Sequence, residues 1–169
     1  GVANNVLLWL KADAGTNTTT NDERVTSWVS QGTSSFTANE VSSDGPTYKT
    51  DGINGHPALD FSDNRMNITG GICEGETKDD IFVYVVSLPR SVNSQRVIFW
   101  QSLNSTRYLL LRQYSSDFAI QFIYGTNHVS YGSAWANSAT AGIVADQAHL
   151  WAVGSTTGAA NTTPNGTRR

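Results

Sequence analysis

The feature that most constrains the fold of this chain is a series of short, β-prone apolar runs separated by turn residues. The clearest runs occupy residues 80–87, 96–100, 108–112, 117–124 and 149–154. They are rich in the β-branched and aromatic residues that favour strands. No segment sustains the 3.6-residue period of an amphipathic helix, although residues 134–147 could hold one helical turn. The pattern therefore predicts an all-β fold, an antiparallel β-sandwich or jelly roll of about nine short strands.

Alternation along the run at residues 117–124 assigns its residues to two faces. Phe118, Ile120, Phe122 and Tyr124 share one face, and Ala119, Gln121 and Ile123 share the other. Successive side chains of a strand point to opposite faces of the sheet, so this division follows from the period of two.

Length and composition fit one soluble domain over residues 1–169. The chain has five Trp, six Tyr and six Phe, enough aromatic surface for a packed core, and one cysteine, which cannot form an internal disulfide. The net charge is −3 with no basic stripe, so we expect no nucleic-acid partner. No apolar run reaches the roughly 18 residues that a spanning helix needs, so we expect no membrane insertion.

The N-terminal third contains four short motifs in a fixed order. They are LWLKADAG at residues 8–15, VTSW at 25–28, GPTY at 45–48 and GINGHPALDF at 52–61. Residues 6–10 are expected to form a strand buried on both faces. Trp9, Trp28 and Phe61 are expected to lie in the core.

The glycines of the fourth motif have a conformational role. Gly52 and Gly55 are expected to supply positive φ angles in the turns around Asn54. All four motifs therefore specify a scaffold and carry no chemistry of their own.

Together these motifs resemble the opening of laminin-G-like, concanavalin A-like jelly-roll domains of bacterial surface, secreted and phage virion proteins. The runs at 82–86 and 149–153 also fit strands of that family. The resemblance implies an extracellular, cell-surface or virion location. In that family another strand follows the equivalent of 149–153. The resemblance therefore implies a sandwich without its C-terminal strand, because the chain is truncated or clipped after Arg169, or because a second chain supplies the strand.

Residue patterns typical of catalysis are missing from the sequence. Glycosidases of this fold carry a Glu-x-Asp-x-x-Glu motif, which the chain lacks, and its acidic pairs fall in loops or at a strand edge. His56, His128 and His149 have no zinc-type spacing. We therefore expect a binding or adhesion module and not an enzyme. A glycoside hydrolase or polysaccharide lyase on the same fold is the third alternative.

A glycan site on this fold would combine an aromatic platform with hydrogen-bonding side chains. The candidate glycan-binding residues are Arg112, Tyr114, Gln121, Tyr124, Asn127, Tyr131, Trp135 and Asn137. They predict a carbohydrate-binding module of a larger extracellular protein, with a glycan or polysaccharide as partner. Tyr131 and Trp135 could instead be ordinary packing aromatics. The alternative for the whole chain is a structural or decoration domain that makes protein–protein contacts in a virion or surface assembly.

Calcium is the cofactor that the resemblance suggests, because relatives of this fold often hold Ca²⁺ on loop carboxylates and carbonyls. The candidate ligands are Asp13, Asp60, Asp63 and Asn64, with Asp79 and Asp80 behind them. The alternative is that Asp13 and Asp63 only cap turns.

Overall fold

The computed structural model describes residues 6–72, 81–90, 96–102, 107–114, 119–126, 134–136 and 144–155. These residues form small antiparallel sheets and turns, and no helix occurs among them. The prediction of an all-β fold is therefore confirmed. The chain divides into two compact units, Gly1–Ile72 and Cys73–Arg169. The single domain expected over residues 1–169 stays a prediction.

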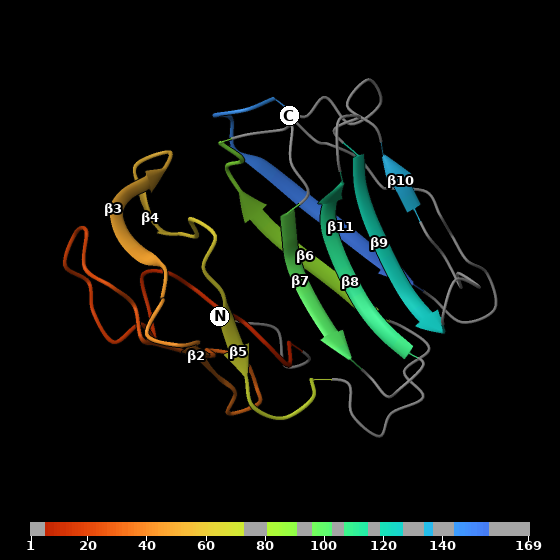
Figure 1. Cartoon of the computed structure of the whole chain (residues 1–169), viewed down its shortest axis with the longest axis horizontal. Coiled ribbons are helices and arrows are strands. Elements are labelled where there is room, and N and C mark those ends of the chain that lie inside the picture. Colours follow the sequence, from red (N-terminus) through yellow and green to blue (C-terminus); the bar gives the residue numbers. More distant parts are fainter. Residues whose placement is uncertain are drawn as a thin grey trace. The chain divides into compact units, whose positions relative to one another are not determined.

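The first unit contains two small sheets (Figure 1). Strands β1 (Ser27–Val29), β2 (Thr37–Glu40) and β5 (Met66–Ile68) form a three-stranded antiparallel sheet in the order β1-β2-β5. Strands β3 (Thr47–Ile53) and β4 (His56–Asp60) form a hairpin.

The hairpin between β3 and β4 turns on two residues with positive φ. Asn54 has a φ of 51° and Gly55 one of 78°, as in the type I′ turns that match the twist of paired strands. The predicted role of Gly55 is thus confirmed, but Gly52 does not have a positive φ. Gly52 is required for a different reason, because a Cβ at this position would overlap the Cβ of Ala58 on the facing strand.

The core of the first unit differs from the core that the sequence predicts. Among the described residues of this unit, the buried apolar side chains are those of Val25, Ala38, Pro46 and Tyr48. Phe61 is 47% exposed and Trp9 is 36% exposed. Residues 6–10 do not form a strand. Their main chain instead binds a neighbouring loop, since Gln31 N donates to Trp9 O. The predicted N-terminal strand and the core positions of Trp9 and Phe61 are therefore wrong.

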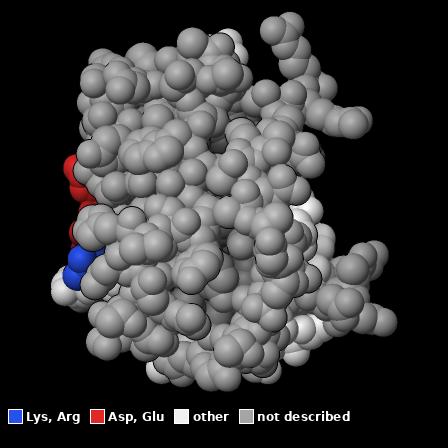
Figure 2. All heavy atoms as spheres, turned by 90° about the vertical axis from the view of Figure 1, so that its right-hand side faces the viewer, with Lys and Arg blue, Asp and Glu red and all other residues white. Residues whose placement is uncertain are grey.

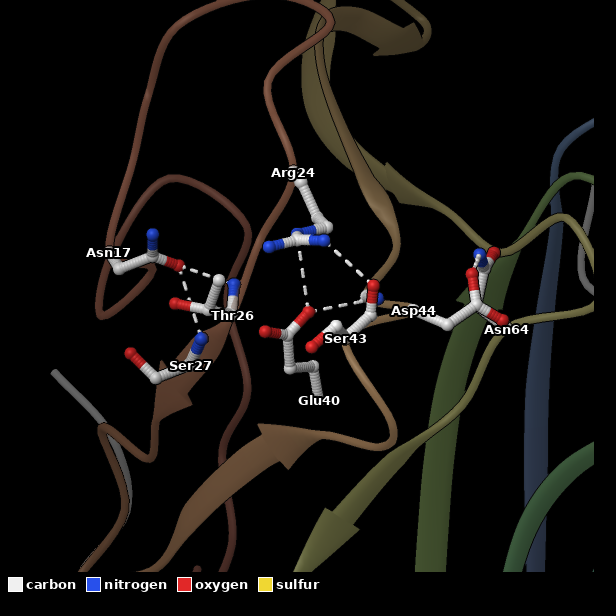
Figure 3. Close-up of polar contacts among 9 residues, drawn as sticks. Asn17, Arg24, Thr26, Ser27, Glu40, Ser43, Asp44 and Asn64 are labelled. Atoms are coloured by element: carbon white, nitrogen blue, oxygen red, sulfur yellow. Dashed lines mark hydrogen bonds and ion pairs between the residues drawn. The ribbon is translucent and has the colours of Figure 1, made fainter.

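A polar cluster joins three segments of the first unit (Figure 3). Oε2 of Glu40 accepts a hydrogen bond from Gly45 N at 3.1 Å and lies 3.3 Å from Nε of Arg24. The Arg24 guanidinium also donates to the carbonyl of Ser43 at 2.7 Å. The cluster therefore holds the turn after β2 against the segment that leads into β1.

The turn after β2 carries backbone strain. Ser42 and Ser43 both have a φ of 58°, and Asp44 N donates to Val41 O across the turn. Consecutive positive φ angles favour Asn followed by Gly, so two serines are a costly choice.

Replacing Ser42 by Asn and Ser43 by Gly should therefore raise the free energy of unfolding by about 1 kcal/mol. The bond from Arg24 uses the main-chain carbonyl of residue 43 and survives the change. Urea unfolding followed by tryptophan fluorescence measures the effect. The single variant Ser43→Ala, which keeps a Cβ, is the control and should give no gain. If the double variant were no more stable than the parent chain, the inference that the turn after β2 is strained would be wrong.

The second unit contains a two-stranded and a four-stranded sheet. Strands β6 (Ile81–Ser87) and β11 (His149–Ser155) pair antiparallel along their whole length. The four-stranded sheet comprises β7 (Arg96–Ser102), β8 (Arg107–Tyr114), β9 (Ala119–Thr126) and β10 (Ala134–Ala136). The described residues of the runs predicted as strands at 80–87, 96–100, 108–112, 117–124 and 149–154 all lie in these strands, whereas residues 80, 117 and 118 fall outside the described part of the chain. Residues 134–136 are a strand and not part of a helical turn.

One face of β6 is unusually apolar and open to solvent. Phe82, Tyr84 and Val86 alternate along the strand and are each 60% exposed or more. Leu150, which lies opposite Val86 on β11, is also exposed. Nearly continuous apolar sequence predicts burial on both faces, and that is not observed here.

Candidate functional site

The register of the four-stranded sheet decides which residues share a face. The strands lie in the order β10-β9-β8-β7 and all neighbours are antiparallel (Figure 1). Residues directly opposite each other in such a sheet lie on the same face. Val97, Arg112, Gln121 and Trp135 are opposite one another in turn, so they form one row across all four strands.

A β-bulge in β7 brings a further aromatic residue to this face. Val97 pairs with Arg112, but the next pair is Phe99 with Leu111, so Ile98 is an extra residue. Trp100 then lies opposite Leu110, two positions from Arg112 on β8. Both Val97 and Trp100 therefore share the face of Arg112, which regular alternation along β7 would not allow.

This face is open to solvent along β7. Trp100 is 62% exposed and Val97 is 57% exposed, whereas Phe99 and Gln101, on the opposite face, are half-buried. We call it the candidate face and define it by Val97, Trp100, Arg112, Tyr114, Gln121 and Trp135. A sheet face that combines an exposed tryptophan with an arginine and a glutamine position has the chemistry to stack on a ring and to donate hydrogen bonds to its substituents.

The structure separates the predicted glycan-binding residues into groups. Arg112, Tyr114, Gln121 and Trp135 lie on the candidate face. Tyr124 lies opposite Leu109 and therefore belongs to the other face of the same sheet. The remaining three predictions, Asn127, Tyr131 and Asn137, fall outside the described residues.

Val97 and Trp100 are the residues of the candidate face that sequence analysis missed, and Trp100 is the one whose ring can stack on a ligand. The apolar run at residues 96–100 predicts a strand but does not say which of its residues are exposed. The spacing of three between Val97 and Trp100 conceals their common face, because it departs from the period of two.

The opposite face of this sheet contains a buried side-chain amide, that of Gln101, without a hydrogen-bond partner in the described part of the chain. Both terminal atoms of this amide are inaccessible to solvent. Burial of an unpaired amide is costly, so such groups normally have a partner. We assign Gln101 no binding role.

The predicted calcium ligands engage other protein groups. Asp13 forms an ion pair with Lys11 at 3.3 Å. Asn64 donates from its amide nitrogen to Asp44 and accepts from Ser62 N, as Figure 3 shows for the Asp44 contact. Asp60 ends β4, and Asp63 has a φ of 65° in the following turn.

In the part of the chain that the structure describes, no group of three or more His, Cys, Asp or Glu side chains is arranged to hold a metal ion. Asp79 and Asp80 lie outside that part. Calcium binding stays a prediction.

The histidine of β11 has a structural role. His149 is buried at the start of the strand, and its Nε2 lies 3.0 Å from the carbonyl oxygen and 3.2 Å from the nitrogen of Val144. The ring thus ties the loop before β11 to the strand.

The described charged side chains show no basic surface in the view of Figure 2. Acidic and basic atoms there lie together at one edge of the molecule. No helix among the described residues has the length and apolar character to cross a membrane. The absence of nucleic-acid and membrane partners stays a prediction.

Comparison with protein-family models, with curated proteins and with solved structures finds no match to this chain.

Proposed function

We propose that this protein is a non-catalytic carbohydrate-binding or adhesion module of a larger extracellular or surface protein. The observation that carries the proposal is the candidate face, where the exposed indole of Trp100 shares one side of the sheet with Arg112 and Trp135. Binding sites for small polar ligands combine apolar aromatic surface with a few hydrogen-bonding groups. Sugar rings have apolar C–H faces and polar edges, so they suit this combination.

The same sheet supports a concanavalin A-like sandwich as the fold. Its second face carries apolar residues at successive register positions, namely Leu109, Leu111, Ile120 and Phe122. An apolar sheet face must be covered by another layer of structure. In a sandwich the second sheet covers it and leaves the candidate face free for a ligand.

The composition of the sheet supports binding without catalysis. Strands β7, β8, β9 and β10 contain no Asp or Glu. Hydrolysis of a glycosidic bond normally requires two carboxyl groups that flank it. A ligand held on the candidate face therefore meets no general acid or base from these strands. An extracellular, cell-surface or virion location fits a module of this kind and is part of the proposal.

Replacing Trp100 by Ala should weaken glycan binding by about tenfold to thirtyfold, because truncating a central aromatic anchor costs about 2 kcal/mol. The purified chain is first applied to a broad glycan array to find a ligand. Affinities for that ligand are then measured by biolayer interferometry on the immobilised polysaccharide.

Tyr84→Ala is the matched control, because Tyr84 is an equally exposed aromatic on the other sheet of the second unit. It should bind like the parent chain. Far-ultraviolet circular dichroism shows whether both variants are folded. Equal losses in the two variants, or no binding on the array, would refute the proposal.

A second candidate function rests on the exposed face of β6. Phe82, Tyr84 and Val86 form a continuous apolar strip, and such strips often mark contacts with other proteins. This strip favours a structural or decoration domain in a virion or surface assembly. A chain that binds no glycan on the array would make this candidate the better one.

A further inference from the structure

The four-stranded sheet has a charge that differs from that of the chain. Its strands contain Arg96, Arg107 and Arg112 but no acidic residue, whereas the whole chain has a net charge of −3. No cross-strand ion pair can therefore form within the sheet, although such pairs are common between neighbouring strands. The sheet is a positively charged element in an acidic chain.

The register places one of these arginines apart from the other two. Arg96 lies opposite Gln113 and Arg107 lies opposite Thr126, which puts both on the face opposite to the candidate face. Arg112 is the only charged residue of these strands on the candidate face. It lies on an inner strand, between Val97 of β7 and Gln121 of β9.

We propose that the candidate face selects a glycan that carries carboxylate groups, and that Arg112 is the residue that selects it. The proposal rests on the proposed function and names its ligand class. It is carried by the juxtaposition of a lone arginine position with exposed Trp100 and with Gln121 and Trp135, in a sheet without acids. A uronic acid offers both a ring for the aromatic residues and a carboxylate for the guanidinium.

The chemistry of arginine favours a carboxylate in particular. The planar guanidinium presents parallel N–H groups that match the two oxygens of a carboxylate, and it stays charged at all physiological pH values. Its attraction for an anion at a sheet surface is weakened by salt. Binding through Arg112 should therefore depend on both the carboxylate and the ionic strength.

The experiment compares polysaccharides that differ only in the carboxyl group. Polygalacturonate, alginate and hyaluronan are immobilised beside their carboxyl-reduced forms, in which each carboxylate is a primary alcohol, and beside carrageenan, which carries sulfate esters and no carboxylate. We expect at least one acidic polymer to bind about tenfold more tightly than its reduced form. Raising the NaCl concentration from about 50 to about 500 mM shortens the Debye length roughly threefold, so it should reduce this preference.

Variants of Arg112 and of Arg107, both on β8, then test whether Arg112 is the residue that selects the carboxylate. Arg112→Gln should abolish the preference for the acidic polymer, and Arg112→Lys should keep its salt dependence at reduced affinity. Arg107→Gln removes the same charge from the opposite face of β8 and should keep the preference. If Arg112→Gln does not fold, the comparison of acidic and reduced polymers on the parent chain still decides the ligand class.

Each other outcome overturns a distinct part of the argument. Equal binding of acidic and reduced polymers would refute carboxylate selection and leave glycan binding intact. Binding of carrageenan alone would refute the carboxylate in favour of sulfate. Equal loss in the Arg107 and Arg112 variants would refute the role of Arg112. No binding to any of the polymers would refute the carboxylate proposal, and the glycan array separately decides whether the proposed function fails with it.

Discussion

Replacing Gly15 by Ala is expected to lower the free energy of unfolding by about 3–5 kcal/mol, because two separate costs coincide there. Gly15 has a φ of 86°, a conformation that side chains disfavour. A Cβ at this position would also overlap the carbonyl oxygen of Val29. Val29 N donates to Gly15 O at 2.8 Å, so the two segments cannot separate without losing this hydrogen bond. Urea unfolding followed by tryptophan fluorescence measures the change.

Gly55→Ala is the matched control for this variant. Gly55 has a similar φ of 78°, but a Cβ there would have no neighbour within 4 Å. The variant carries only the conformational cost, about 1 kcal/mol. If Gly15→Ala were no more destabilising than Gly55→Ala, the close approach of Gly15 to Val29 would be wrong.

Replacing Tyr48 by Ala should cost a similar amount, about 3–5 kcal/mol, because it removes a buried aromatic ring and leaves a cavity. Tyr48 is 2% exposed and lies on β3 opposite Leu59. Its main chain also pairs with the preceding loop, since Tyr48 N donates to Glu23 O. Those main-chain hydrogen bonds remain in the variant, so the decrease in the free energy of unfolding reports the contribution of the side chain alone. Thermal unfolding and urea titration both report it.

The variant Phe61→Ala distinguishes the observed core, which contains Tyr48, from the core predicted from the sequence, which contains Phe61. Phe61 is 47% exposed, so its loss should cost only about 1 kcal/mol. Tyr48→Phe tests the hydroxyl group and should stay within about 0.5 kcal/mol of the parent chain. A larger loss at Phe61 than at Tyr48 would restore the core predicted from the sequence.

Local features of the fold were predictable wherever neighbouring residues determine the conformation. Asn54-Gly55 is the preferred pair for a two-residue hairpin turn, and the turn forms there. The strand predicted at residues 6–10 was wrong, because an apolar run indicates burial but does not show that a neighbouring strand is there to pair with it. The short strand β5 (Met66–Ile68) was missed because three residues show no periodicity.

Half of the candidate glycan-binding residues lie on the candidate face. Not all of them can lie there, because successive side chains of a strand point to opposite faces of the sheet. The period of two separates Gln121 from Tyr124 correctly, but sequence analysis grouped them by composition and not by face. Trp100 could not be assigned, because its face depends on an extra residue in β7 and on the register with β8. Register is a property of strand pairs, and a single sequence does not reveal it.

The extra residue at Ile98 also bears on how this surface could change during evolution. In a regular strand, a one-residue insertion or deletion transfers every later side chain to the other face of the sheet. A bulge absorbs such a change locally, because the paired residues on both sides of it keep their partners. Length variation at the start of β7 would thus leave Trp100 on the candidate face, so this face could tolerate insertions that would disrupt it in an unbroken strand.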